Sequence, residues 1–397
     1  MRYPRVRVAV LVLGISLLVI PAGTAQAGEL RTFLNISGLH GAVFSGSPGE
    51  ANDVAITQTG TNQFSITDAL PITPPPVGAA DGCTVSTYSA TCNVQNVAVN
   101  LGDGSDRANV ASATPLGYDD SVTGTTLESV VIAGEGGDDT LSASAPASTN
   151  PGDRAVGLYG ETQHGALGLE IVGFTFPPDV PGNDTLTGGD ENDVIYGGPG
   201  DDNISSGAGN DQIDNGYYSN QALPNGTAGS DTIDAGPGID KVTGAEAHSR
   251  NLSSATPDAP DTIACGSGDD TPPDPRFVGD QADAGASDLV DTDCEAIFVD
   301  YACPADGPIV CNVALDVTAT VDGTTALKAA GHKSRSHKIV LGEANAKVPR
   351  GQHFPISVHL KRGKVKQALR KRKTAPARQT IVTKKLGKES AKFRLRK

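Results

Sequence analysis

Residues 181–214 read PGNDTLTGGDENDVIYGGPGDDNISSGAGNDQID, and this stretch repeats one pattern every nine residues. Each repeat has glycines, then an aspartate, then a branched apolar residue two positions after the aspartate. The aspartates are Asp184, Asp193, Asp202 and Asp211, and the apolar residues are Leu186, Ile195, Ile204 and Ile213. Self-similarity at a fixed short period is typical of solenoids, so the spacing predicts a repetitive fold.

Weaker copies of the pattern flank this run. It resumes with Asp231, Asp240, Asp261 and Asp270, and an earlier copy contains Asp139, which lies forty-five residues, or five periods, before Asp184. The repeats resemble the RTX (hemolysin-type) calcium-binding nonapeptide, G-G-x-G-x-D-x-U-x. The resemblance implies an all-β fold, a parallel β-roll or β-helix solenoid, in which the glycine-aspartate half is a turn and the x-U-x half a short strand. Two repeats would form one coil of eighteen residues.

The resemblance also implies which residues bind calcium. The expected metal site residues are Asp139, Asp184, Asp193, Asp202, Asp211, Asp231, Asp240, Asp270, Gly188, Gly197, Gly200, Gly209, Gly238 and Gly268. The chemistry agrees, because Ca²⁺ takes six to eight oxygen ligands and glycine lets backbone carbonyls approach an ion. Turns on one edge of the roll are eighteen residues apart. We therefore expect Asp184 and Asp202 to share a calcium ion, and Asp193 and Asp211 to share another.

Gly-Asp runs also form tight turns that need no metal. The charge distribution favours the metal interpretation. Residues 28–320 hold 43 acidic and 6 basic side chains, so carboxylates stacked on successive coils would repel one another without a cation between them. Glu191 and Ser206 replace turn glycines, which predicts weak or empty sites there, and the longer spacings predict that loops such as Tyr217–Gly226 bulge from the roll.

The N-terminus indicates export. Three arginines precede an apolar run from Val8 to Ile20, and the small-residue sequence Ala25-Gln26-Ala27 follows, so residues 1–27 read as a signal peptide. The alternative is a retained membrane anchor, but the run is shorter than the roughly 20 residues of a spanning helix. We expect a secreted or cell-surface protein with no membrane span in the mature chain.

The six cysteines suit an oxidising compartment. Six cysteines allow fifteen pairings, of which nearest-neighbour pairing is the simplest: Cys83 with Cys92, Cys265 with Cys294, and Cys303 with Cys311. A zinc site is the rival interpretation. It is disfavoured because the chain has no Cys-x-x-Cys pair and no histidine near any cysteine.

The flanks predict two further β regions. Residues 28–132 contain period-two stretches that read as strands, are loosely similar to secreted actinobacterial proteins of this type, and would cap the roll at residues 133–300. Residues 301–397 would form a small basic β-sandwich-like module, with strands at His353–Leu360 and around Phe393 and a helix at Lys364–Arg372. Residues 321–397 carry 22 basic and 3 acidic side chains. That charge either binds an anionic cell-wall polymer or another polyanion, or is a solvated face that balances the acidic roll.

No nucleophile elbow, zinc-protease motif or phosphate loop occurs in the chain. The sequence therefore predicts a secreted, non-enzymatic protein whose Gly/Asp turns bind Ca²⁺ and fold outside the cell, with no specific nucleic-acid partner. One alternative is a surface-adhesion protein whose roll is a stalk and whose basic module is the anchor. A second is a polysaccharide-active enzyme on a β-helix, since carboxylates are abundant.

Overall fold

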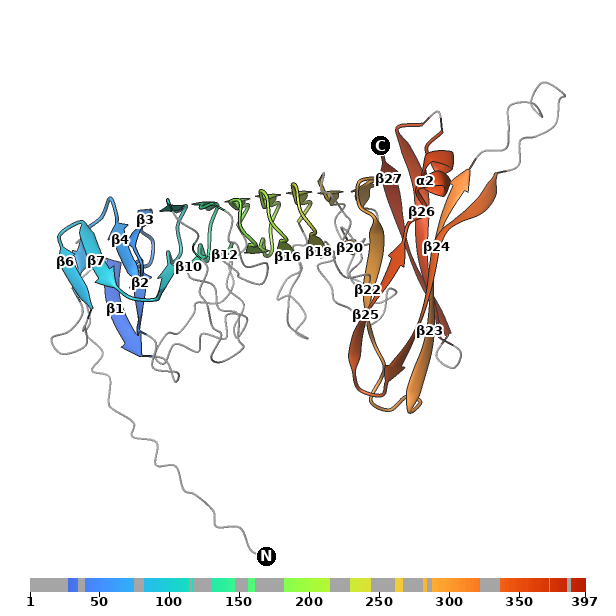
Figure 1. Cartoon of the computed structure of the whole chain (residues 1–397), viewed down its shortest axis with the longest axis horizontal. Coiled ribbons are helices and arrows are strands. Elements are labelled where there is room, and N and C mark those ends of the chain that lie inside the picture. The colour runs from blue at the N-terminus through green and yellow to red at the C-terminus, as the bar shows by residue number, and fades with distance from the viewer. Residues whose placement is uncertain are drawn as a thin grey trace, which may run out of the picture.

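The computed structural model describes residues 28–34, 40–74, 82–113, 116, 130–146, 156–160, 182–214, 229–243, 261–266, 281–283, 288–321, 336–370, 372–383 and 387–397. The predicted signal peptide, the predicted bulge at Tyr217–Gly226, Gly268 and Asp270 lie outside these ranges. The described chain is all-β apart from one short helix, and its middle is a thin roll of short strands between two broader β regions (Figure 1). The predicted parallel β-roll is confirmed.

Successive strands of the roll alternate between two parallel sheets. One sheet contains β8 (Asn96–Asn100), β10 (Val130–Ala133), β12 (Val156–Tyr159), β14 (Val194–Tyr196), β16 (Gln212–Asp214), β18 (Lys241–Thr243) and β20 (Gln281–Asp283). The other contains β9 (Arg107–Ser112), β11 (Thr140–Ser144), β13 (Thr185–Thr187), β15 (Asn203–Ser205), β17 (Thr232–Asp234), β19 (Thr262–Ala264) and β21 (Leu289–Asp291). The chain thus passes once through each sheet in every coil, as two nonapeptides per coil require.

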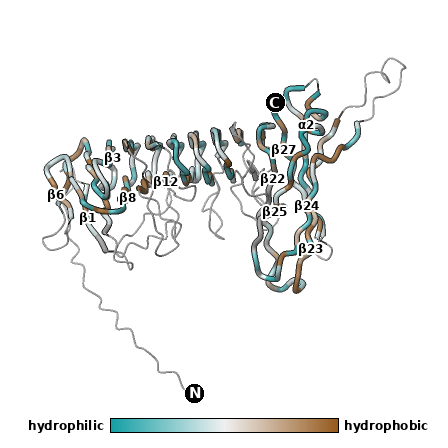
Figure 2. The backbone as a smooth tube through the Cα atoms, in the orientation of Figure 1, coloured by the Kyte–Doolittle hydropathy of each residue, from teal (hydrophilic) through white to brown (hydrophobic). Residues whose placement is uncertain are grey.

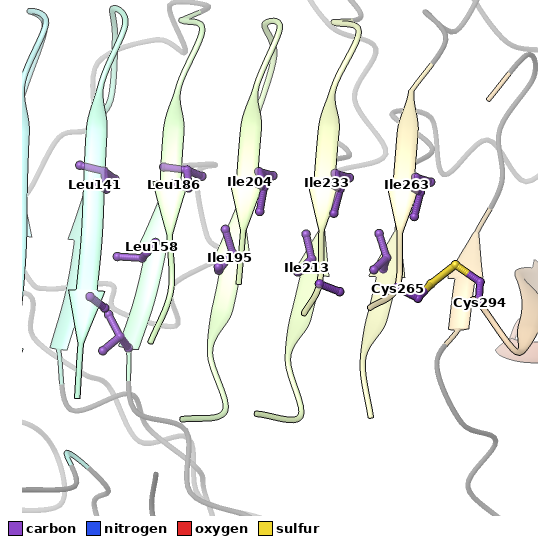
Figure 3. Packing of buried hydrophobic residues seen from close by; sticks show 14 of the residues in the cluster. Leu141, Leu158, Leu186, Ile195, Ile204, Ile213, Ile233, Ile263, Cys265 and Cys294 are labelled. Carbon is purple, nitrogen blue, oxygen red and sulfur yellow. A yellow bond between two sulfur atoms is a disulfide. The ribbon is translucent and has the colours of Figure 1, made fainter. Parts of the chain in front are cut away.

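The core of the roll consists of two facing columns of aliphatic side chains (Figure 3). Leu186 pairs with Ile204 in one sheet, and Ile195 pairs with Ile213 in the other. All four are at most 1% exposed. Each three-residue strand therefore contributes one inward residue that stacks on its equivalent in the next coil. Such a core needs no aromatic side chains, which agrees with their scarcity in the sequence.

The N-terminal region belongs to the same two sheets. Its other strands are β1 (Gly28–Leu34), β2 (His40–Ser45), β3 (Asp53–Gly60), β4 (Gln63–Thr67), β5 (Ile72–Thr73), β6 (Cys83–Ser86) and β7 (Ser89–Asn93). β2 pairs in parallel with β8, and β3 pairs in parallel with β9. Antiparallel pairing then takes over in β1, β4, β6 and β7. The expected cap is thus continuous with the roll, and no break in the sheets falls at residue 132.

The C-terminal region also continues both sheets. Its elements are β22 (Ala296–Ala302), β23 (Val310–Val321), β24 (His337–Pro349), β25 (His353–His359), α2 (Arg362–Ala368), β26 (Thr374–Thr383) and β27 (Gly387–Arg396). β27 pairs in parallel with β21, and β25 pairs antiparallel with β22. The expected strands match β25 and β27, and the helix begins two residues earlier than predicted and ends four earlier. The sequence analysis did not identify the long strands β23, β24 and β26.

Covalent and ionic contacts close the roll at this end. Three disulfides follow the nearest-neighbour pairing, and Cys265–Cys294 joins the turn after β19 to the segment after β21 (Figure 3). The Arg396 guanidinium donates two hydrogen bonds to the Asp291 carboxylate. No helix in the described part of the chain is long and apolar enough to cross a bilayer.

Candidate metal centre

The turn aspartates of the roll form a hydrogen-bonded row along one edge. The backbone N–H of each aspartate donates to Oδ1 of the aspartate in the next coil: Asp106 to Asp139 (2.8 Å), Asp139 to Asp184 (2.8 Å), Asp184 to Asp202 (2.8 Å), Asp202 to Asp231 (2.7 Å), Asp231 to Asp261 (3.0 Å) and Asp261 to Asp288 (3.2 Å). We call this the long aspartate row. The aspartates that recur along the sequence are therefore stacked on one another in successive coils.

A shorter row lies on the opposite edge. Asp193 N–H donates to Asp211 Oδ1, and Asp211 N–H donates to Asp240 Oδ1, both at 2.8 Å. The predicted neighbours, Asp184 with Asp202 and Asp193 with Asp211, are thus adjacent on their respective edges. All seven predicted site aspartates in the described part of the chain are 1–2% exposed and lie in one of the two rows.

The position of Asp139 differs from the simplest expectation. Five nine-residue periods are two and a half coils, which would put Asp139 and Asp184 on opposite edges. They are instead direct neighbours on the same edge. The reason is that the chain between them makes a single coil, passing through β11 and then β12 before it reaches β13.

The second carboxylate oxygen distinguishes these residues from ordinary turn aspartates. Oδ2 of Asp106, Asp139 and Asp184 is buried without a hydrogen-bond partner, and so is Oδ1 of Asp193. Burying an ionised carboxylate without compensation is costly. Burial accordingly raises the pKa of Asp139 and Asp193 to about 8 and that of Asp184 to about 7, although backbone N–H donors oppose the shift. Near neutral pH the raised pKa values favour a bound proton, or a cation in its place, at these three carboxyls.

Two glycines lie where oxygen atoms of adjacent coils converge. A Cβ on Gly160 would lie 2.0 Å from Asp184 Oδ2 and 2.1 Å from the Gly197 carbonyl oxygen. A Cβ on Gly188 would lie 2.5 Å from Asp193 Oδ2, which accepts the Gly189 N–H at 2.8 Å, and 2.1 Å from the Ser206 carbonyl oxygen. In both places a carboxylate oxygen and a carbonyl oxygen from the next coil converge beside a backbone without a side chain. Hard oxygen donors of these two kinds are the ligands that calcium prefers.

The other predicted glycines serve the packing of one coil on the next. Gly200, Gly209 and Gly238 have φ between +147° and +157°. A Cβ at these positions would lie 1.4–2.0 Å from a carbonyl oxygen of the neighbouring coil. Their role in the structure is steric, and they bring the turns close enough for oxygen atoms of adjacent coils to share an ion.

Carbonyl oxygens must complete any coordination shell. Within the described ranges, no three His, Cys, Asp or Glu side chains converge as a metal cluster. A turn site in this roll would therefore combine one or two carboxylates with several backbone oxygens, which suits calcium better than a transition metal.

The two irregular repeats use their substituted side chains structurally. Glu191 is 2% exposed, and one of its carboxylate oxygens accepts the backbone N–H of Leu116 at 2.8 Å, across 75 residues of sequence. Ser206 Oγ donates to the Ala235 carbonyl oxygen at 2.7 Å. The prediction that calcium binds weakly at these turns stays a prediction.

Several members of the rows were not predicted as site residues from the sequence. Asp106 and Asp288 extend the long row at its two ends, and Asn52 occupies the next position, donating its N–H to Asp106 Oδ1 at 2.6 Å. The residue before each aspartate forms another ladder, in which Asn183 Oδ1 accepts the N–H of Asp201 and Asp201 Oδ1 accepts the N–H of Ser230. The recurrence of Asn and Asp at that position in the repeats was the available signal.

Comparison with known proteins supports the same interpretation. The family of RTX calcium-binding nonapeptide repeats, in four copies, matches residues 180–213 and 225–247. These segments contain the aspartates of both rows from Asp184 to Asp240. No curated protein and no solved structure matches the chain. The central segment is therefore similar to repeats that bind calcium. The β regions on either side lie outside the matched segments, so they are described from the structure alone.

Proposed function

We propose that this chain is a secreted, non-enzymatic calcium-binding protein whose β-roll folds when Ca²⁺ binds outside the cell. The observation that carries the proposal is the pair of buried aspartate rows, in which one carboxylate oxygen each of Asp106, Asp139, Asp184 and Asp193 has no hydrogen-bond partner. The match to calcium-binding repeats supports the ion, and three disulfides support an extracellular location.

The energetic role of the ion follows from the rows. When bound, Ca²⁺ neutralises carboxylates that the roll otherwise stacks at close range. A site with a Kd of ~0.1 mM in ~1 mM calcium contributes RT ln(1 + 10), about 1.4 kcal/mol. Because folded domains are stable by only about 5–15 kcal/mol, a handful of such sites decides whether the roll is folded.

Calcium titration monitored by far-UV circular dichroism tests this function. We expect the part of the β signal that comes from the roll to be lost in EDTA and to return on addition of Ca²⁺. An equal concentration of Mg²⁺ should restore much less, because magnesium demands octahedral geometry and gives up its water reluctantly. An unchanged spectrum on chelation would contradict the proposal.

The non-enzymatic part of the proposal rests on how the acids are used. Apart from Asp68 and Asp214, the buried aspartates in the described part of the chain belong to the rows, and two surface hollows, on the outer face of β23, β24, β26 and β27, have no carboxylate in their lining. A pair of acids outside the rows, facing one another in a groove, is what a polysaccharide-active enzyme would need.

A second candidate function is attachment to an anionic surface. It is favoured by the charge of the C-terminal region, where exposed Lys338, Lys347, Lys388, Lys392 and Arg394 lie on strands of one sheet. In that case the roll would hold the N-terminal region away from the anchored C-terminal end, as its elongated shape allows (Figure 1).

A further inference from the structure

One face of the C-terminal sheet gathers the basic side chains. In β23 the residues Val313, Leu315 and Val317 are buried, so the alternate residues, among them Thr318 and Thr320, point outward. The strand register places the basic side chains on this outer face: Lys338 and Lys347 on β24, Arg378 on β26, and Lys388, Lys392, Arg394 and Arg396 on β27. Figure 2 shows hydrophilic and hydrophobic residues alternating along these strands.

The basic residues concentrate around one hollow. Its volume is about 390 Å³, and its lining includes Thr318, Thr320, Lys338, Arg378, Lys392 and Arg394 but no acidic residue. Asp316 and Glu343 are cross-strand neighbours on the same face, two residues along β23 from Thr318, and neither lines the hollow. The hollow is therefore a site of uncompensated positive charge.

Hydrogen bonds hold the two guanidinium groups in place. Arg378 Nη1 donates to Ser390 Oγ at 3.1 Å, and Arg394 Nη2 donates to Thr374 Oγ1 at 2.6 Å. These bonds use neutral acceptors, so each charge stays available to a ligand. Arg396 differs, because the Asp291 carboxylate already neutralises it. A fixed guanidinium with free donors suits bidentate recognition of carboxylate, sulfate or phosphate groups.

We propose that this hollow, with the basic face around it, binds an anionic polysaccharide. The inference deepens the second candidate function and rests on it. The threonine hydroxyls offer hydrogen bonds to sugar hydroxyls. The basic side chains on β24, β26 and β27 are spread across the sheet, so an extended polymer could contact several of them at once. The face lacks the aromatic platform on which single-stranded nucleic acid stacks, because Phe393 is 2% exposed. Its exposed large apolar residues, Val310, Val340 and Val382, are all valines and offer little to a bilayer.

Binding to dextran sulfate, with uncharged dextran of the same length as the control polymer, tests the proposal. The full mature chain is measured in excess calcium, so that the roll is folded. The test variant carries Lys338→Gln, Arg378→Gln, Lys392→Gln and Arg394→Gln. The matched control removes the same charge from exposed residues in and beside α2, through Lys361→Gln, Lys364→Gln, Lys366→Gln and Arg370→Gln.

We expect the unmodified chain and the α2 variant to bind dextran sulfate but not dextran, and the hollow variant to bind at least about tenfold more weakly. The slope of log K against log salt should also become shallower in the hollow variant, because fewer counterions are released. Equal losses in both variants would overturn the proposal, since net charge alone would then explain binding.

Two other probes test the partner class. Tighter binding to oligothymidylate or to anionic lipid vesicles than to dextran sulfate, abolished by the hollow variant, would overturn the polysaccharide assignment. Calcium-dependent circular dichroism of both variants should match the unmodified chain. If dextran sulfate binding fails while this signal persists, the inference fails and the calcium-dependent folding function stands.

Discussion

Aspartates of the long row such as Asp139 and Asp184 use one carboxylate oxygen for the fold and leave the other buried without a hydrogen-bond partner. In Asp184, Oδ1 accepts the N–H of Asp139, and Oδ2 is buried beside Gly160 without a partner. The first oxygen makes the hydrogen bond that a neutral amide could also make. Only the second requires a full negative charge, so the two roles can be separated by mutation.

Asp184→Asn should therefore affect stability in opposite directions with and without calcium. The amide keeps the Oδ1 acceptor and removes a charge that is costly to bury, so we expect equal or higher stability in EDTA. In calcium we expect a loss of about 1.4 kcal/mol, the contribution of one site at tenfold saturation. Denaturant unfolding at both conditions measures this.

Asp201→Asn is the control for this change. Asp201 immediately precedes Asp202 but is exposed, and its Oδ1 accepts the N–H of Ser230. We expect no change in calcium-dependent stability. If Asp184→Asn behaves like this control in calcium, the long row does not bind the ion through that carboxylate.

Gly188 gives a steric version of the same experiment. A methyl group there would overlap both Asp193 Oδ2 and the Ser206 carbonyl oxygen, whereas Gly363 in α2 has nothing within 4 Å of its missing Cβ. We expect Gly188→Ala to lower stability by about 1–3 kcal/mol, as overpacking does, and to weaken calcium binding. Gly363→Ala should be neutral or stabilising. Calorimetric calcium titration of both variants separates the outcomes, and unchanged affinity in Gly188→Ala would rule out an ion beside that glycine.

At the scale of the element, the carboxylates of a row act together and make the roll sensitive to pH. Burial raises the pKa of Asp139 and Asp193 to about 8 and that of Asp184 and Asp211 to about 7, against about 3.9 in an unfolded chain. A carboxyl with a raised pKa contributes stability that is fully present below its unfolded pKa. That stability is lost as pH rises through the folded value.

Without calcium, the roll should therefore be more stable at pH 5 than at pH 8. Calcium competes with the protons, so the stabilisation by calcium should grow over the same range. We expect far-UV circular dichroism in EDTA to show some of the β signal of the roll at pH 5 and the loss of that contribution by pH 8, while calcium preserves it at pH 8. A β signal in EDTA that increases with pH would show that the rows are not protonated in the metal-free protein.

How far the sequence predicts an element depends on whether its contacts are local. The nine-residue spacing was enough to predict that Asp184 and Asp202 are neighbours on one edge, because each coil contacts the next. The spacing could not predict the edge on which Asp139 lies, because the coil between Asp139 and Asp184 is longer than two repeats. It also missed the joining of β21 to β27, which pairs Leu289 with Arg394 across a hundred residues. Such pairing leaves no periodic signal in the sequence.

At the scale of the whole molecule, two continuous sheets connect regions with different sources of stability. The sheets run from the N-terminal strands through the roll into the C-terminal region, with twelve and fifteen strands respectively. The roll has narrow aliphatic columns and buried carboxylates, whereas β23–β27 have long strands around apolar residues such as Leu315, Leu341 and Phe393. Because burial of apolar surface needs no ion, only the roll should depend on calcium.

Hydrogen exchange followed by mass spectrometry can resolve these regions. In calcium, we expect slow exchange in peptides from β13–β17 and in peptides from β23 and β26. On chelation, the roll peptides should exchange rapidly because the paired carboxylates repel one another. Those from β23 and β26 should remain protected, because their apolar core and the Cys303–Cys311 disulfide are unaffected. Equal loss of protection in β23 would instead mean that the ion stabilises the two sheets as a single cooperative unit. In that case the C-terminal region cannot stay folded once the strands β21 and β22 have lost their partners in the roll.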